Sequence, residues 1–319
     1  MSRTPLSRTP MGRSRSAHAA APPPRVSSAK LPSSPPPAPR PAVAEPPVAV
    51  RRPVVRLRHR TPLVLLLPAL LAGALLILPL AALLARTPWS RLPELLSTSQ
   101  VQQALLLSLR CSLGALLLSV VLGIPLAHLL ARSTLPGKAL LRALVTVPLV
   151  LPPVVGGVAL LLAFGRRGVL GPALVEVGAV PTFTTWGVIL AETFVALPFL
   201  VLTVEGAIAG LDRAAEETAA TLGASPLRVF TTITLPAIGP SIAAGAALAW
   251  ARALGEFGAT ITFAGSLPGR TQTLPLAVYE LLSDDPAAAY AVSALLLIVS
   301  LGLVVLLRAR LPRLTRAPR

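Results

Sequence analysis

Long runs of apolar residues, separated by short segments with charged and turn-forming residues, dominate this chain from about residue 62 onward. A helix needs about 20 apolar residues to cross the hydrocarbon core of a bilayer. None of the runs shows the sustained alternation of apolar and polar positions that is typical of a half-buried strand. The pattern predicts an all-α polytopic membrane protein whose six transmembrane helices cover approximately 62–85, 104–131, 141–164, 183–208, 238–264 and 288–308.

The composition supports a membrane protein independently of the spans. Hydrophobic residues make up 54% of the chain and charged residues 13%, whereas a soluble domain has about 25% charged residues. The net charge is +17, but the basic residues lie mostly in tails and loops beside the apolar runs, so we expect no nucleic-acid partner. The single cysteine, Cys111, excludes an intrachain disulfide, and no cluster of cysteine or histidine indicates a metal site.

Basic residues near the ends of the spans predict the orientation in the membrane. With the N-terminus inside the cell, 15 lysines and arginines flank the spans on the cytoplasmic side and 5 lie in outer loops. This asymmetry follows the positive-inside rule. We therefore expect a multi-pass protein of the plasma membrane with both termini in the cytoplasm, a transmembrane domain over 61–308, and a basic cytoplasmic tail over 309–319.

Residues 1–60 differ from the rest of the chain. They hold 14 of the 35 prolines, many arginines and serines, and one acid, Glu45. Such a segment has too little apolar surface to offset the entropy of ordering, so it is predicted to be a disordered cytoplasmic arm. Binding of anionic lipid by its arginines and a twin-arginine signal at Arg51-Arg52 are alternatives to a plain tail.

The residues of the predicted cytoplasmic loop over about 209–236 favour two helices joined by a turn. Asp212, Arg213, Glu216 and Glu217 among alanines suit a helix at the membrane surface over 207–222. Gly223 can adopt a positive φ and end that helix. A second short helix can follow, with Ser225 as its cap and Pro226 in its first turn. The expected result is a compact knob that presents an apolar face and one charge: Leu227, Val229, Phe230 and Arg228.

The spacing E-x-A-x-x-L-G, from Glu217 to Gly223, followed by I-x-L-P, from Ile233 to Pro236, resembles the cytoplasmic "EAA" loop of ABC-importer permeases. Thr218 departs from the alanine that is usual in the family. We call residues 209–236 the coupling loop, because the resemblance implies that it docks on an ATP-hydrolysing subunit. The alternative is an ordinary connector between spans. The implied contact residues are Glu217, Gly223, Ala224, Ser225, Pro226, Leu227, Arg228 and Phe230.

Three further stretches resemble the permease subunit of molybdate ABC transporters, which is close to sulfate permeases. They are V-P-L-V-L-P-P-V-V-G-G at 147–157, R-A-L-G-E-F-G-A-T at 252–260 and L-P-G-R-T-Q-T-L-P-L-A-V-Y at 267–279. The resemblance covers about residues 62–308. It implies a homodimer with the pathway at its interface, cytoplasmic ATP-binding subunits and an extracytoplasmic oxyanion-binding protein. A sulfate or tungstate permease is the alternative within this fold.

Charged residues inside a bilayer are costly and usually face a bundle interior or water. Arg252 and Glu256 lie four residues apart in the fifth predicted span, so they can neutralise one another within the helix or between subunits. Alternatively, Arg252 and Thr260 can attract an oxyanion in the pathway. Glu192 and Arg110 form a second possible pair. Pro152-Pro153 is expected to break the third predicted span, which can line a pathway or permit close helix packing.

The chain has no G-x-x-x-x-G-K-[ST] loop to cradle phosphates, so it is predicted not to be an enzyme and to bind no cofactor. ATP would be used by the partner subunit. Two other classes of protein are alternatives at this point. A secondary transporter would need no cytoplasmic knob, and a membrane enzyme would need a catalytic cluster, which the scattered His18, His59 and His128 do not supply.

Overall fold

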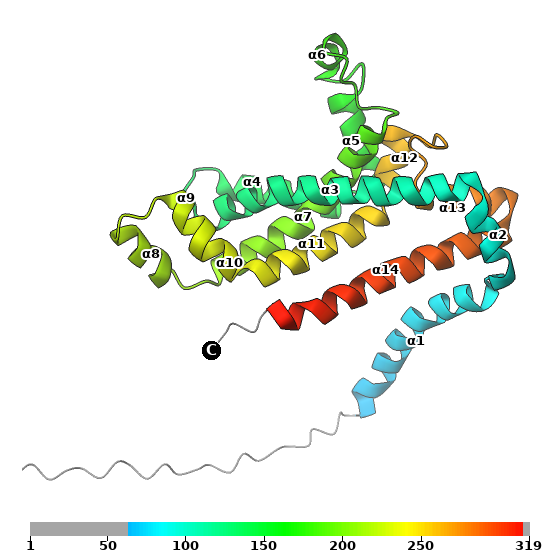
Figure 1. Ribbon diagram of the computed structural model, residues 1–319, viewed down its shortest axis with the longest axis horizontal. Coiled ribbons are helices and arrows are strands. Elements are labelled where there is room, and N and C mark those ends of the chain that lie inside the picture. Colours follow the sequence, from blue (N-terminus) through cyan, green and yellow to red (C-terminus); the bar gives the residue numbers. More distant parts are fainter. Residues whose placement is uncertain (1–62, 315–319) are drawn as a thin grey trace, which may run out of the picture. The chain divides into compact units, whose positions relative to one another are not determined.

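The computed structural model describes residues 63–314, and every regular element in this range is a helix (Figure 1). The predicted arm over 1–60 lies outside the described residues, as do residues 315–319 of the predicted tail. The helices that form the bundle are α1 (Leu63–Arg86), α3 (Ser99–Arg132), α4 (Lys138–Val150), α5 (Pro153–Phe164), α7 (Thr185–Ala209), α11 (Gly239–Leu254), α12 (Gly258–Ala264) and α14 (Pro286–Leu314). Shorter elements connect them: η1 (Trp89–Arg91), α2 (Leu92–Ser97), α6 (Gly171–Glu176), α8 (Ala214–Thr221), α9 (Pro226–Val229), the π-helix η2 (Phe230–Thr234), α10 (Leu235–Ala237) and α13 (Leu274–Asp284).

Three of the described helices, α1, α3 and α7, are long and apolar enough to cross a membrane. A fourth crossing is possible if Pro226–Ala237 and Gly239–Leu254, which meet at an angle of 73°, form one bent span. An all-α membrane fold is therefore confirmed, whereas the count of six spans stays a prediction.

Two predicted spans are each divided into two helices. The span over 141–164 is interrupted between Val150 and Pro153, where Leu151 has an extended backbone. A residue that precedes proline is disfavoured in the α region, and proline has no N–H to continue the helix. The span over 238–264 is interrupted between Leu254 and Gly258. The second halves of both spans, α5 and α12, pack against one another.

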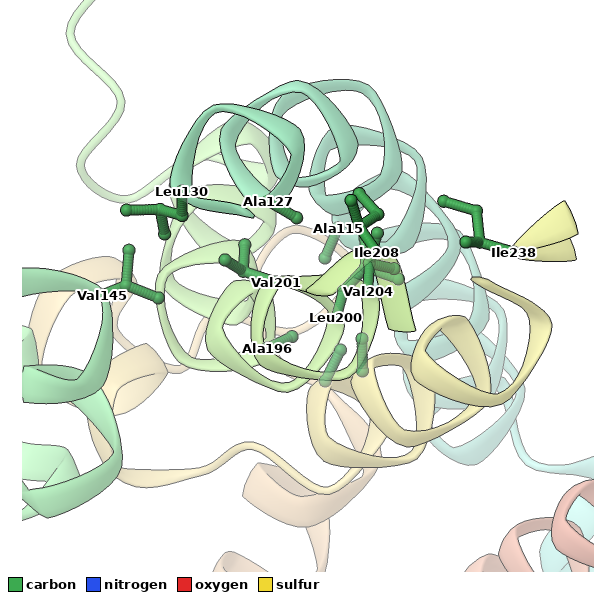
Figure 2. Packing of buried hydrophobic residues seen from close by; sticks show 12 residues of the cluster. Ala115, Ala127, Leu130, Val145, Ala196, Leu200, Val201, Val204, Ile208 and Ile238 are labelled. Atoms are coloured by element: carbon green, nitrogen blue, oxygen red, sulfur yellow. The ribbon is translucent and has the colours of Figure 1, made fainter. Parts of the chain in front are cut away.

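The core lies where α3 packs along α7 and α11 packs along both (Figure 2). Small side chains make this close approach possible, since Ala115, Ala127, Ala196 and Ala249 are fully buried. Larger residues such as Leu200 and Val204 fill the remaining space between the helices. This is the packing expected of membrane helices, whose association depends on close contact more than on the hydrophobic effect.

The loop between α12 and α13 turns inward at its end, and we call its last three residues, 271–273, the buried loop. Thr271, Gln272 and Thr273 are at most 1% exposed. Glu280 of α13 accepts hydrogen bonds from Ser266 and from Gln272. Residues 267–270 of the same loop are exposed, so its placement as an outer loop stays a prediction. Its last three residues are turned inward, where buried polar groups need hydrogen-bond partners.

The helix α3 relates this buried loop to the coupling loop. The backbone N–H of Leu274 donates to Ser108 Oγ at 2.7 Å, and Arg132 at the other end of α3 pairs with Glu216. At a rise of about 1.5 Å per residue, these two contacts lie about 36 Å apart along the helix. This separation exceeds the hydrocarbon core of about 30 Å, so it is long enough for the predicted placement of the two loops on opposite sides of the membrane.

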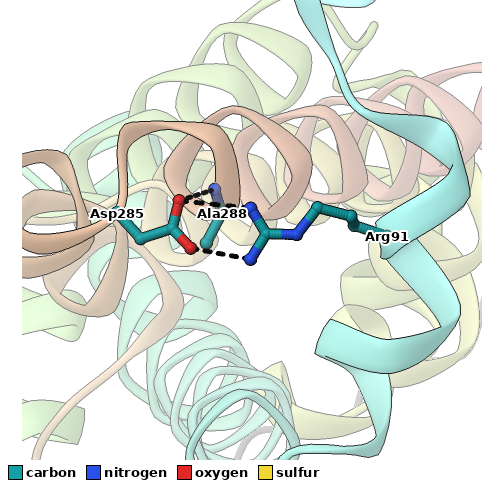
Figure 3. Close-up of polar contacts among 3 residues, drawn as sticks. All are labelled: Arg91, Asp285 and Ala288. Atoms are coloured by element: carbon teal, nitrogen blue, oxygen red, sulfur yellow. Dashed lines mark hydrogen bonds and ion pairs between the residues drawn. The ribbon is translucent and has the colours of Figure 1, made fainter.

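An exposed ion pair joins η1 to the start of α14 (Figure 3). Arg91 Nη2 donates to Asp285 Oδ2 at 2.8 Å, and the backbone N–H of Ala288 donates to Asp285 Oδ1 at 3.0 Å. The hydrogen bond from Arg91, followed by that from Ala288, lowers the pKa of Asp285. The carboxylate therefore caps α14 and ties it to the segment that leads into α3.

We predict that cysteines introduced at Ser225 and Arg270, which are both exposed, react with a membrane-impermeant thiol reagent from opposite sides. Each variant carries Cys111→Ala, although Cys111 is fully buried. Labelling in sealed right-side-out and inverted vesicles distinguishes the two sides. Reaction of both positions in the same vesicle orientation would contradict this placement.

We predict that Asp285→Asn lowers the Tm of the purified protein at pH 7, because it removes the ionised partner of Arg91. The pKa of Asp285 is below its unfolded value of about 3.9 in the folded state. The stabilisation is therefore complete above that pH and is lost as the pH falls through the folded pKa. Thermal unfolding of both proteins from pH 7 to pH 3 should show the Tm difference shrinking below about pH 4. A difference that stays constant would refute the assignment.

Candidate functional site

The coupling loop turns sharply between α8 and α9. Gly223 has φ of 83°, a conformation that glycine adopts at little cost. The backbone N–H of Gly223 donates to the Ala220 carbonyl and that of Ala224 to the Ala219 carbonyl, each at 3.0 Å. This pair of hydrogen bonds is a Schellman motif, which satisfies the last carbonyls of α8. The predicted helix end at Gly223 is confirmed.

The short helix after the turn begins as predicted. Ser225 has an extended backbone, and its hydroxyl accepts a hydrogen bond from the Arg228 N–H at 3.4 Å. Pro226 is the first residue of α9, where its missing N–H costs nothing. Leu227 is 72% exposed, and Leu222 just before the turn is 83% exposed. The knob, residues 225–230, thus presents an apolar surface that α8 and α9 leave uncovered.

Two parts of the loop differ from the sequence prediction. The helix expected over 207–222 is divided, because α7 ends at Ala209 and Asp212 Oδ1 accepts a hydrogen bond from the Ala214 N–H, which starts α8 separately. Phe230–Thr234 forms a π-helix, and Leu235-Pro236 begins α10 instead of ending the loop. A π-helix is rare and is often found at functional positions.

Phe230, which was expected on the contact face of the knob, points back to α3 instead. Its ring centroid lies 4.8 Å from that of His128 in an edge-to-face arrangement. Phe230 therefore packs against α3, whereas most of the other predicted contact residues of the loop are exposed: Glu217, Gly223, Ser225, Pro226, Leu227 and Arg228.

Glu216, which the motif did not single out, makes polar contacts with two elements outside its own helix. Arg132 Nη2 donates to Glu216 Oε1 at 3.2 Å, and Arg132 Nε lies 3.1 Å from Glu216 Oε2. Thr234 Oγ1 donates to Glu216 Oε1 at 2.7 Å. Glu217, one residue further along α8, is exposed. Successive residues on a helix point in directions about 100° apart, so adjacent acids face different surroundings, but the spacing alone does not tell which acid faces inward.

A pocket of about 660 Å³ separates the knob from the end of α3. Pro125, His128, Leu129, Arg132 and Ser133 line it from α3 and the following loop, and Pro226, Leu227 and Phe230 line it from the coupling loop. The knob is therefore held beside α3 through a few contacts rather than through a continuous apolar core.

Arg252 and Glu256 neutralise one another within one chain segment, as predicted. Arg252 Nη1 lies 2.5 Å from Glu256 Oε2. Glu256 Oε1 also accepts a hydrogen bond from the Ala259 N–H at 2.8 Å, which places the carboxylate at the start of α12. Because Glu256 is 2% exposed, Arg252 has its counter-charge in place, and attraction of an oxyanion by Arg252 stays the untested alternative.

The break at Pro152-Pro153 brings α5 onto α12. A Cβ atom at Gly157 would lie 2.7 Å from the Thr262 Cβ and 2.8 Å from the Ala259 carbonyl oxygen, so only glycine fits this contact. Close packing thus explains Gly157, and a role for Pro152 and Pro153 in the pathway stays a prediction. Thr260 is fully buried in α12.

The suggested pair of Glu192 and Arg110 is not formed. Glu192 is 1% exposed, and Arg110 lies on the exposed side of α3. Among the side chains that the structure describes, the ion pairs between different elements are Arg91–Asp285, Arg132–Glu216 and Arg142–Glu205. The last of these joins α4 to α7, and no sequence motif pointed to it.

Residues 119–316 match the family model described as binding-protein-dependent transport system inner membrane component. The molybdenum transport system permease protein ModB of Mycobacterium tuberculosis is 47% identical over 246 residues, which cover 77% of this chain and 93% of that protein. ModB of Escherichia coli is 45% identical over 206 residues, covering 64% and 90%. The sulfate transport system permease protein CysT of Escherichia coli is 36% identical over 234 residues, covering 72% and 84%.

A solved structure also shares the fold. The crystal structure of a bacterial alginate ABC transporter in complex with an alginate pentasaccharide-bound periplasmic protein superposes with a TM-score of 0.65. It is 21% identical and covers 80% of this chain and 95% of that chain. The helical fold, the apolar spans and the family match agree, and the chain belongs to the family of binding-protein-dependent transport system inner membrane components.

Proposed function

We propose that this chain is the permease subunit of an ABC importer and forms the membrane pathway for uptake of molybdate. The observation that carries the proposal is the 45–47% identity to molybdenum transport permeases over 90–93% of their length. The 36% identity to a sulfate permease is lower, which favours molybdate over sulfate as the cargo. A tungstate permease of the same fold is the second candidate.

The coupling loop supplies the mechanical part of this function. Its exposed Leu222 and Leu227 form an apolar surface that needs a partner, and exposed apolar groups rimmed by polar ones mark protein contacts. We assign this surface to a cytoplasmic ATP-binding subunit, which binds and hydrolyses the ATP. Glu217 and Arg228, both exposed, provide the charged rim of the contact. A secondary transporter would have no use for such a surface.

The pathway needs no tight anion site in the permease. Arg252, the partly exposed cation of the fifth predicted span, is neutralised by Glu256, and a neutralised guanidinium attracts an oxyanion weakly. Selection of the anion therefore falls to an extracytoplasmic oxyanion-binding protein. A periplasmic protein is bound in the alginate transporter that shares the fold, which supports a partner of this kind on the outer face.

The proposed assembly is a homodimer in the plasma membrane with two ATPase subunits on its coupling loops. Both termini lie in the cytoplasm, as the excess of basic residues on that side indicates. In this arrangement Thr260, Pro152 and Pro153 lie beside the pathway.

Uptake into vesicles tests the function. The permease is reconstituted with its ATPase and binding protein, and molybdate accumulation is measured with and without ATP. We expect accumulation that requires ATP and both partners and that resists competition by sulfate better than by tungstate. Accumulation driven by an ion gradient without the ATPase would support a secondary transporter instead.

We predict that Gly223→Val abolishes recovery of the ATPase on the purified permease and ATP-driven uptake, because valine at φ of 83° forces the knob into another orientation. The cost of this backbone conformation is about 1–2 kcal/mol for an ordinary residue. The membrane bundle should remain folded, since the Cβ position at Gly223 meets no atom within 4 Å.

Gly137→Val is the matched control. Gly137 precedes α4 with φ of 82°, and its Cβ position is equally open. We expect this variant to bear similar strain and yet keep the ATPase and the uptake. Equal losses in both variants would mean that the knob has no special role in docking.

A further inference from the structure

Glu216 is held by contacts from two elements outside its own helix. Arg132 at the end of α3 approaches both carboxylate oxygens, and Thr234 at the end of the π-helix donates to Oε1. The side chains of Arg132 and Glu216 are only 13% and 16% exposed. Hydrogen bonds between ionised groups are stronger than those between neutral groups. Glu216 therefore joins α8, α3 and the π-helix at one point.

The rest of the coupling loop has little packing of its own. Neither α8 nor α9 contains a buried residue, and Thr234 is the buried residue of the π-helix. The pocket of about 660 Å³ lies between the knob and α3. Few contacts are therefore available to carry a displacement of the loop into the membrane helices. One is the contact of Phe230 with His128, and others are the ion pair and hydrogen bonds of Glu216.

Both elements that Glu216 holds lead into the bundle. The helix α3 packs along α7 and reaches the buried loop at Ser108. The π-helix runs through α10 into α11 at the 73° bend, next to Ile238 of the core. A carboxylate at this junction can move the two helices together when the loop is displaced.

We propose that Glu216 is a positioning residue that transmits movement of the coupling loop to α3 and α11. Its carboxylate keeps the loop in register with both helices, so that ATP hydrolysis on the partner is converted into movement of the pathway. This role rests on the proposed function, and it differs from that of Glu217, whose side chain faces away from the bundle toward the ATPase.

Transport and hydrolysis measured together test the proposal. Glu216→Gln, Arg132→Gln and the double variant are purified with the ATPase, and molybdate uptake is divided by ATP hydrolysed. Glu216→Gln should still bind the ATPase and hydrolyse ATP, whereas uptake per ATP should fall about five- to tenfold, as for a coupling of typical size. The double variant should be no worse than the worse single one, because the two residues act as a unit.

Asp212→Asn is the matched control. It changes a carboxylate to an amide in the same loop, and the amide oxygen can still accept from the Ala214 N–H. Uptake per ATP should remain that of the unmodified protein. A loss of the same size as in Glu216→Gln would show that any carboxylate of the loop serves, and the proposal would be wrong.

A second measurement does not depend on transport. Spin labels at Ala220 of α8 and Leu135 after α3, both exposed, report the distance between the loop and α3 in the Cys111→Ala background. The distance distribution should be narrow in the protein that keeps Glu216 and broad in the Glu216→Gln variant. Equal distributions, or an unchanged uptake per ATP, would overturn the role of Glu216. If the unmodified complex shows no ATP-driven uptake at all, the proposed function itself fails, and the transmission role fails with it.

Discussion

The packing of α3 along α7 is the contact on which the other parts of the permease depend. In hydrocarbon, helices gain little from burying apolar side chains against one another, so they must approach closely to stay together. The buried alanines of these two helices permit that approach. Because α3 bears Ser108 toward one end and Arg132 at the other, both the buried loop and the coupling loop are positioned by the same rigid helix.

Neutralisation of charge is the second constraint, and it follows from the first. Close packing excludes water, so an ionised group between helices needs a partner. Glu256 has Arg252, Glu205 has Arg142 and Glu216 has Arg132. Each of these arginines therefore has a carboxylate as its counter-charge. A permease built in this way is suited to passing an anion selected elsewhere, as the proposed role of a separate binding protein requires.

Local geometry could be predicted from the sequence where a residue type strongly favours one conformation or one contact. Gly223 takes a positive φ, Ser225 caps α9, and Arg252 pairs with Glu256 at a spacing of four residues. Features that depend on distant segments could not be predicted. The inward turn of Gln272 requires Glu280, the inward position of Glu216 requires Arg132 and Thr234, and the break before Gly258 requires the surface of α5.

The adjacent acids Glu216 and Glu217 show how one short helix can serve two surfaces. A rotation of about 100° per residue directs the first toward α3 and leaves the second exposed. A partner that binds the exposed side displaces α8 as a whole, because a helix of eight residues moves as a rigid unit. The inward carboxylate then moves with it. Glu217 thus faces the partner, and Glu216 transmits the movement of α8 to α3. The weakly packed knob leaves room for this displacement.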